Sequence, residues 1–133
     1  MCLIYVIRTY FFLLKNIKFE NKVNLSINEI VSKITDSAYD TEINLVKILK
    51  STGYAEDYIL FKFKEAMGQT PVEFLTKIRI EHALRLIDIY QNKISINELS
   101  EKCGYSDATY FSKRFKAITG VSPKKYITDL KNK

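Results

Sequence analysis

Residues 104–116 read Gly104-Tyr105-Ser106-Asp107-Ala108-Thr109-Tyr110-Phe111-Ser112-Lys113-Arg114-Phe115-Lys116, and Gly120 and Pro123 follow. A fainter copy at residues 53–64 reads Gly53-Tyr54-Ala55-Glu56-Asp57-Tyr58-Ile59-Leu60-Phe61-Lys62-Phe63-Lys64, followed by Gly68 and Pro71. A shift of 52 residues aligns the aromatic, basic and proline positions, whereas the first glycine aligns at 51. The second copy therefore has one extra residue in its turn. Two copies about fifty residues apart indicate a duplicated supersecondary unit.

The composition predicts an all-α fold. The 133 residues are 47% hydrophobic, which is enough for a core, and they include only 4 glycines and 2 prolines. The β-branched residues follow helical rather than alternating spacing. The two cysteines, Cys2 and Cys103, lack the spacing of a zinc site, so we expect free thiols, a cytoplasmic protein and no metal or other cofactor.

The positive charge is concentrated at the C-terminal end. Residues 102–133 hold eight lysines and arginines against two acidic residues, which accounts for the whole net charge of +6. A clustered basic region is typical of a protein that binds a polyanion, most often nucleic acid. A solvated lysine-rich tail would explain the charge equally well.

Local signals divide the chain into helices. Residues 2–14 are almost entirely apolar but too short for a membrane span, so we expect a helix with a broad apolar face and no membrane contact. Asn16 to Asn24 is expected to be a polar linker. Capping boxes at Ser26, Thr70 and Ser95 each predict a helix start.

Further signals complete the helix assignment. Thr41 is expected to cap one helix and Ser106 another, while Gly68 and Gly120 are expected to end helices. The helix that starts at Pro71 has no breaker before about Tyr90 and is apolar on two sides, which predicts a strut packed between two lobes.

Each repeat is predicted to be a helix, a tight turn with glycine, and a second helix. This is the helix-turn-helix arrangement, whose second helix can lie in the major groove of DNA. A single such unit is a weak signal, because any small helical bundle contains something similar. Two copies, a strut and a basic second copy are stronger together.

These residues resemble the DNA-binding domain of the AraC/XylS transcription regulators over about residues 27–130. The motifs that carry the resemblance are Ser95-Ile96, Gly104 to Lys116, Gly120 with Ser122-Pro123-Lys124-Lys125-Tyr126, Phe63-Lys64 with Gly68 and Pro71, and Phe74-Leu75 with Arg79-Ile80. The resemblance implies two helix-turn-helix lobes joined by a long helix, about seven helices besides the N-terminal one. It also implies recognition helices in successive major grooves, about 34 Å apart.

The resemblance further implies a division of the chain and a set of partners. Residues 1–24 would be the remnant of a preceding sensor or dimerisation domain, although a small standalone regulator is the alternative. Residues 25–133 would form the DNA-binding domain, with lobe one at 25–70, the connecting helix at 71–91 and lobe two at 92–133. The partners would be double-stranded DNA, RNA polymerase and a second copy of the chain through the N-terminal region.

In the second lobe, the family pattern directs Ala108, Thr109, Ser112 and Lys113 toward the groove. Arg114 and Lys116 are expected to hold phosphates, and Lys124 is expected to contact DNA. Free N–H groups at the helix starts near Ser106 and Pro123 are further phosphate candidates. Tyr110, Phe111 and Phe115 are expected in the core.

The first lobe departs from the pattern. Its groove-facing positions hold Asp57, Leu60 and Phe61, and its phosphate contacts would be Lys62 and Lys64. Carboxylates repel phosphates, and Leu60 and Phe61 can pack only on apolar groups such as thymine methyls. We therefore expect this lobe to read sequence weakly or to dock on another surface, unless its register is off by one. Arg79 and His82 on the strut are expected to be structural.

Three classes of function compete. Sequence-specific DNA binding, with the second lobe as main reader, agrees with the repeat and the charge. A helical protein-interaction module that has lost specific DNA binding is the alternative, favoured by Leu60 and Phe61. An enzymatic function is not supported, since the sequence has neither a serine–histidine–acid set nor a phosphate-binding glycine loop.

Overall fold

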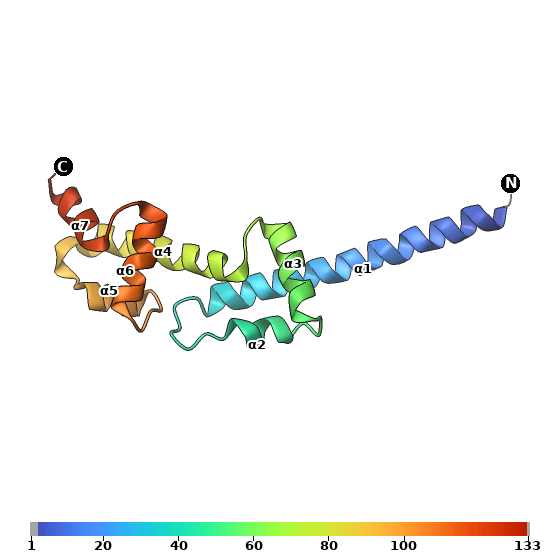
Figure 1. The fold of residues 1–133 in the computed structure, drawn as a ribbon, viewed down its shortest axis with the longest axis horizontal. Coiled ribbons are helices and arrows are strands. Elements are labelled where there is room, and N and C mark those ends of the chain that lie inside the picture. The colour runs from blue at the N-terminus through green and yellow to red at the C-terminus, as the bar shows by residue number, and fades with distance from the viewer. Residues whose placement is uncertain (1–2, 133) are drawn as a thin grey trace.

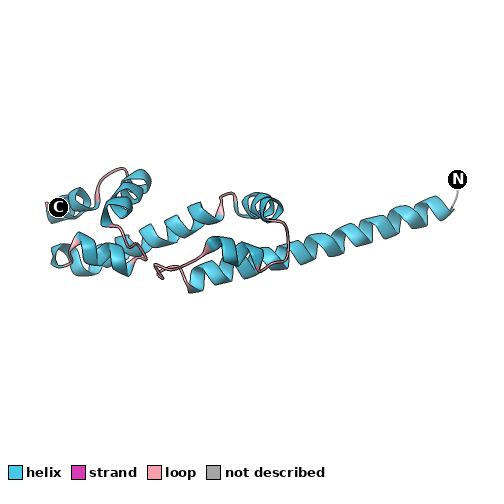
Figure 2. Ribbon diagram, turned by 60° about the horizontal axis from the view of Figure 1, so that its bottom comes forward, coloured by secondary structure: helices cyan, strands magenta, loops and turns pink. Residues whose placement is uncertain are grey.

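The computed structural model describes the backbone of residues 3–132 and the side chains of residues 19–132. Over that range the chain folds into helices joined by loops, without a strand (Figure 2). The helices are α1 (Leu3–Asp36), α2 (Leu45–Lys50), α3 (Glu56–Met67), α4 (Pro71–Tyr90), α5 (Ile96–Lys102), α6 (Ala108–Thr119) and α7 (Pro123–Lys131), with a 3-10 turn at Gln91–Lys93. The all-α prediction is confirmed.

The helix α4 joins two lobes that lie at its opposite ends (Figure 1). Its start is the expected capping box: the Thr70 hydroxyl accepts from the Glu73 N–H at 3.1 Å, and the Glu73 carboxylate accepts from the Thr70 N–H at 3.3 Å. Leu75 near this end packs in one core, and Ile80 and Ile87 farther along pack in the other. The helix is therefore the two-sided strut that its sequence predicts.

Each lobe has its own hydrophobic core. Lobe one is built from α1, α2, α3 and the start of α4, and its buried residues are Val23, Ile27, Ile30, Ile34, Ala38, Leu49, Ile59, Phe63 and Leu75. Lobe two is built from the rest of α4 with α5, α6 and α7, and its buried residues are Ile80, Ala83, Ile87, Ile94, Leu99, Cys103, Tyr105, Phe111, Phe115 and Ile127.

The duplication includes the bracing helix of each lobe. The buried positions of α1 and α4 share one spacing, offset by 53 residues: Val23, Ile27, Ile30 and Ile34 correspond to Thr76, Ile80, Ala83 and Ile87. Such a four-three-four spacing places side chains on one face of a helix. The C-terminal half of α1 therefore supports lobe one as α4 supports lobe two.

The predicted linker at Asn16 to Asn24 is wrong, because α1 continues through it as one helix of 34 residues. The stretch contains neither glycine nor proline, and its lysines, glutamate and asparagines are tolerated in helices. Burial of Val23 in the lobe-one core further stabilises the helical conformation there. Ser26 consequently lies within the helix, so the capping box predicted there does not start one.

The N-terminal half of α1 extends away from lobe one (Figure 1). The helix predicted at residues 2–14 is confirmed from Leu3 onward, whereas its apolar face lies outside the described side chains. Among the residues described, no helix is long and apolar enough to span a bilayer.

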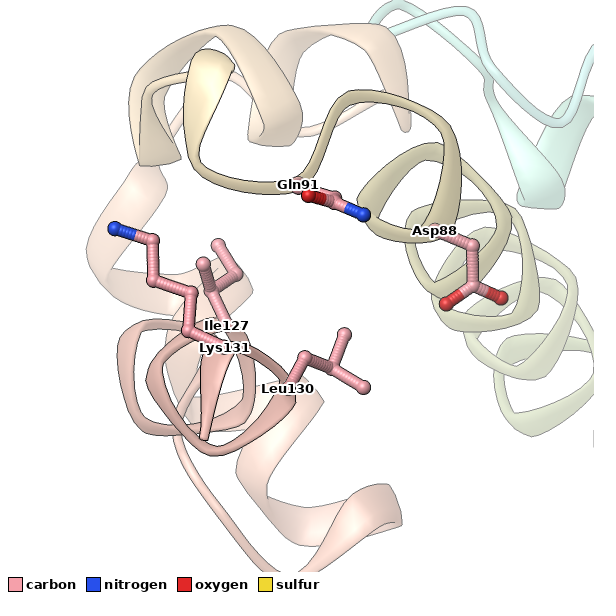
Figure 3. Close-up of a pocket in the computed structure, with 5 residues that line it drawn as sticks. All are labelled: Asp88, Gln91, Ile127, Leu130 and Lys131. Carbon is pink, nitrogen blue, oxygen red and sulfur yellow. The ribbon is translucent and has the colours of Figure 1, made fainter. Parts of the chain in front are cut away.

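A small hollow lies between the end of α4 and α7 in lobe two. It has a volume of about 150 Å³ and is lined by Asp88, Gln91, Ile127, Leu130 and Lys131 (Figure 3). Two aliphatic side chains and two unlike charges do not form a set of groups directed at one ligand. We interpret the hollow as a consequence of packing α7 against the turn at Gln91.

Candidate nucleic-acid interface

The two repeated segments form the helices α3 and α6, which run in the same direction across the long axis of the molecule (Figure 1). Each has 12 residues, and each ends at a glycine in the left-handed conformation, Gly68 at φ 72° and Gly120 at φ 90°. The predicted glycine stops are confirmed. The structure therefore presents two equivalent helices, one in each lobe.

The exposed face of α6 carries the predicted base-reading residues. Phe111 and Phe115 are completely buried, which fixes the opposite face toward solvent. Thr109 and Lys113 on that face are exposed, and Ala108 and Ser112 are half-buried. Lys116 is exposed one turn beyond Lys113, and Lys124 is exposed in the first turn of α7. We call the surface formed by Ala108, Thr109, Ser112, Lys113 and Lys116 the α6 face, and it carries two hydroxyls and two ammonium groups.

The start of α6 differs from the prediction. Asp107, rather than Ser106, is the N-cap: its Oδ1 accepts from the N–H of Thr109 at 2.8 Å and from that of Tyr110 at 3.2 Å. A carboxylate is favoured here because it faces the positive end of the helix dipole. These N–H groups are occupied and are not free for phosphate, and Ser106 is simply exposed.

At the start of α7, the Ser122 hydroxyl accepts from the Lys125 N–H at 3.2 Å, as a helix cap should. Asn44, rather than the predicted Thr41, caps α2, where its Oδ1 accepts from the Lys47 N–H at 3.0 Å. Asn44 lies next to the first helical residue, whereas Thr41 lies in the preceding loop.

Two further side chains on α6 differ from their expected positions. Tyr110 is 51% exposed rather than buried, and its ring lies 5.9 Å from that of Tyr105. Arg114 is half-buried against the first turns of α4, beside Glu73 and Thr76, and no protein group accepts a hydrogen bond from its buried Nε. Arg114 is therefore less accessible than Lys116, and its phosphate contact stays a prediction.

On α3, the equivalent face is acidic and apolar. Asp57 and Lys64 are exposed, Leu60 is half-buried, and Phe61 is 64% exposed. Phe61 aligns with Lys113 at the 52-residue shift. We call the surface formed by Asp57, Leu60, Phe61 and Lys64 the α3 face.

Lys62 is turned away from this face and toward α1. Its Nζ lies 3.5 Å from the Glu20 carboxylate and 3.8 Å from the Glu65 carboxylate, and its side chain is only 18% exposed. Burial acts to lower the pKa of Lys62, but Glu20, Glu65 and Tyr58 together outweigh burial and raise it. The expected phosphate contact of Lys62 competes with this pairing, which sequence inspection missed because Glu20 lies 42 residues away.

Arg79 fixes the geometry between the lobes. Its Nε donates to the Ala38 carbonyl at 2.7 Å and its guanidinium also donates to the Asp40 carbonyl at 3.0 Å, both in the loop that closes lobe one. The guanidinium carbon lies 4.9 Å from the centre of the Tyr105 ring in lobe two. The structural role expected for Arg79 is confirmed as a backbone contact.

The only histidine is also engaged within the protein. The His82 ring stacks on Tyr39 with 4.0 Å between centroids, and the Arg85 guanidinium lies 3.4 Å from the Tyr39 hydroxyl. Burial and the positive charge of Arg85 lower the pKa of His82. The structural role expected for His82 agrees with this contact between α4 and the loop after α1.

The comparisons agree with this geometry. A family model for the helix-turn-helix domain matches residues 48–129. The match covers both repeated helices and the strut between them, and the similar solved structures are domains of AraC-type regulators. The chain belongs to the AraC family of helix-turn-helix transcription regulators.

Individual relatives support the same assignment. The HTH-type transcriptional regulator YisR of Bacillus subtilis is 36% identical over 73 residues, which are 55% of this chain and 25% of that protein. The transcriptional regulatory protein HptR of Staphylococcus aureus is 30% identical over 105 residues, 79% of this chain and 40% of that protein. The chain thus spans a quarter to two fifths of the length of these curated relatives.

The fold has a close structural counterpart. The C-terminal domain of AraT, a response regulator from Geobacillus stearothermophilus, has a TM-score of 0.68 and 26% identity, with 78% of this chain and 84% of that one covered. The relatives and the fold are those of bacterial transcription regulators with a DNA-binding domain rather than of enzymes.

Proposed function

We propose that this AraC-type regulator binds double-stranded DNA sequence-specifically and that the α6 face in lobe two is its main reader. The observation that supports the proposal is the exposure of Thr109 and Lys113 directly opposite the buried Phe111 and Phe115. This is the side of a recognition helix that meets base edges in a helix-turn-helix.

The chemistry of the face suits this role. The Thr109 and Ser112 hydroxyls can donate or accept, Ala108 can contact a thymine methyl, and Lys113 can donate to guanine O6 and N7. Lys116 is exposed one turn beyond Lys113, and Lys124 is exposed in the first turn of α7; both can contact phosphate, which sets register without reading sequence. The excess of eight basic over two acidic residues in 102–133 adds long-range attraction.

The proposal also retains the expected division of the chain. The DNA-binding domain comprises residues 25–133 together with Val23 of α1, which lies in the lobe-one core, and the bacterial cytoplasm, where the chromosome lies, is its compartment. Pairing with a second copy through the N-terminal half of α1, and contact with RNA polymerase, stay predictions.

Selection from a pool of randomised duplexes at two salt concentrations tests the proposal. We expect one enriched sequence motif and an affinity that falls steeply with salt, since each phosphate contact releases condensed counterions. Salt-dependent binding without an enriched motif would reject sequence-specific reading.

A second function, docking on another protein, is favoured by one observation: the α3 face is apolar and acidic where a DNA reader is normally polar or basic. If the selection yields neither a motif nor salt dependence, the interaction module becomes the better description.

A further inference from the structure

We infer that the first recognition helix reads thymine methyl groups through Phe61, which makes lobe one a selective reader of a thymine-bearing half-site. The inference rests on the proposed function and goes beyond it by giving α3 a base preference of its own.

The position of Phe61 is the first step of the argument. Ile59 and Phe63 are completely buried, and each lies two residues from Phe61. Two helical positions correspond to about 200°, so Phe61 points directly away from the buried stripe. Lys113 has the same relation to Phe111 and Phe115 on α6. Phe61 therefore occupies the centre of the face that a recognition helix presents to the groove.

Two contacts with α1 hold the orientation of α3. Lys62 pairs with Glu20 on α1, and the Tyr58 ring lies 6.2 Å from the ring of Phe19 on α1. These contacts fix the roll of α3 on α1, so that Phe61 stays outward and 64% exposed. Single exposed apolar residues are common on protein surfaces, and it is this position that distinguishes Phe61.

The chemistry of the face then limits what it can read. Its N-terminal half offers the Asp57 carboxylate and the apolar side chains of Leu60 and Phe61, none of which donates a hydrogen bond. Guanine presents only acceptors in the major groove and therefore finds no partner here. Thymine presents its C5 methyl, which is the apolar group in the groove that Phe61 and Leu60 can bury.

The charges of the face act in opposite directions on DNA, so they do not by themselves produce tight binding. Lys64 is exposed one turn after Phe61 and can hold a phosphate, whereas Glu56 and Asp57 repel the backbone. Lobe one thus adds modest affinity and a distinct preference, and a protein partner that contacts Phe61 is the competing outcome.

Base analogues test the inference. The duplex selected by the wild-type protein is compared with versions in which deoxyuridine replaces thymidine, one position at a time, across the half-site nearer lobe one. Deoxyuridine keeps the pairing and removes only the methyl group. We expect one or two positions at which this change weakens wild-type binding by about fourfold, the equivalent of roughly 0.8 kcal/mol per methyl group.

Variants assign the effect to its residue. Phe61→Ala should bind the thymidine duplex about as weakly as the wild type binds the deoxyuridine duplex, and it should no longer distinguish the two. Val46→Ala, which removes another exposed apolar side chain from α2, should keep the full distinction. Thermal melting verifies that both variants are folded.

Two results would overturn the inference. Wild-type affinity and methyl sensitivity in Phe61→Ala would show that Phe61 does not meet DNA and would favour a protein partner. If deoxyuridine replacement weakens binding of the wild type and of Phe61→Ala equally at every thymine, a residue other than Phe61 contacts the methyl groups. In either case binding to the half-site nearer lobe two would persist, so the proposed function would survive.

Discussion

The Nε of Arg79 donates to the backbone carbonyl of Ala38 at 2.7 Å, which ties the connecting helix to the loop that ends α1. The same guanidinium reaches the Asp40 carbonyl and covers the Tyr105 ring. One buried charge thus connects the loop of lobe one with the turn of lobe two. Contacts of this kind restrain how the loop of lobe one lies relative to lobe two.

Removing the guanidinium should destabilise the whole fold. Arg79→Met keeps most of the aliphatic length but leaves the Ala38 and Asp40 carbonyls without their donor, and a hydrogen bond from a charged group contributes about 1.5–3 kcal/mol. We expect a loss of that order in the free energy of unfolding, measured with urea. Lys77→Met, on an exposed position of the same helix, is the control and should stay within about 0.5 kcal/mol of the wild type. Equal stability of the two variants would show that the hydrogen bonds from Arg79 to Ala38 and Asp40 do not stabilise the fold.

The turn at Gly104 should tolerate no side chain. Its φ is +94°, and a Cβ there would lie 2.9 Å from both the Ala38 carbonyl oxygen and the Arg79 Nε. Gly53 has a similar φ of +80° but open space around it, so Gly53→Ala measures the backbone cost alone, about 1–2 kcal/mol. We expect Gly104→Ala to lose clearly more free energy of unfolding than Gly53→Ala, as measured by chemical denaturation. Equal losses of stability in the two variants would mean that the Arg79 side chain and the Ala38 loop can move to make room for the Cβ.

Substitution of Asp107, the N-cap of α6, should lower the stability of the protein, whereas substitution of Ser106 should not. Asp107→Ala removes the acceptor for two N–H groups and should cost about 1 kcal/mol of stability, whereas Ser106→Ala should cost almost nothing. Differential scanning calorimetry of the two variants decides between them. A larger loss of stability for Ser106→Ala than for Asp107→Ala would instead identify Ser106 as the N-cap.

Much of the fold could be predicted because its signals are local. Gly68 and Gly120 end helices through their own backbone freedom, and Thr70 with Pro71 starts one through neighbouring groups. The wrong linker and the wrong helix start at Ser26 depend on distant contacts. Ser26 matches a capping box, yet burial of Val23 and Ile27 keeps the chain helical around it.

Some features of the candidate site could likewise be predicted from the sequence, and others could not. The exposed face of α6 follows from the helical spacing of Phe111 and Phe115, which the sequence displays. That spacing should also have placed Tyr110 outside, since it is one residue and about 100° from Phe111. The pairing of Lys62 with Glu20 could not be foreseen, because it depends on α1 continuing as a helix past lobe one.

The single histidine should make stability depend on pH. The folded pKa of His82 is lowered by burial and by Arg85, so the unfolded chain binds the proton more readily. The free energy of unfolding should therefore decrease as the pH falls through the unfolded pKa of about 6.5. His82→Gln removes the titration. The stability difference between wild type and variant should shrink from pH 7.5 to 5.5, and a difference that is constant with pH would contradict the expected shift.

Two lysines of the α6 face should affect DNA binding in different ways. Lys113→Ala should relax the preference at one base pair of the selected site, because a donor to guanine carries about 1–3 kcal/mol of discrimination. Lys116→Ala should weaken binding to all sequences alike and reduce the slope of log affinity against log salt by about 1, as expected when one phosphate contact is lost. Fluorescence anisotropy with matched and mismatched duplexes at several salt concentrations separates the two effects. Lys47→Ala, which removes an exposed lysine from α2, should change neither quantity. If Lys113→Ala alters only the salt slope, Lys113 holds a phosphate and the base reading of α6 must come from Thr109 and Ser112.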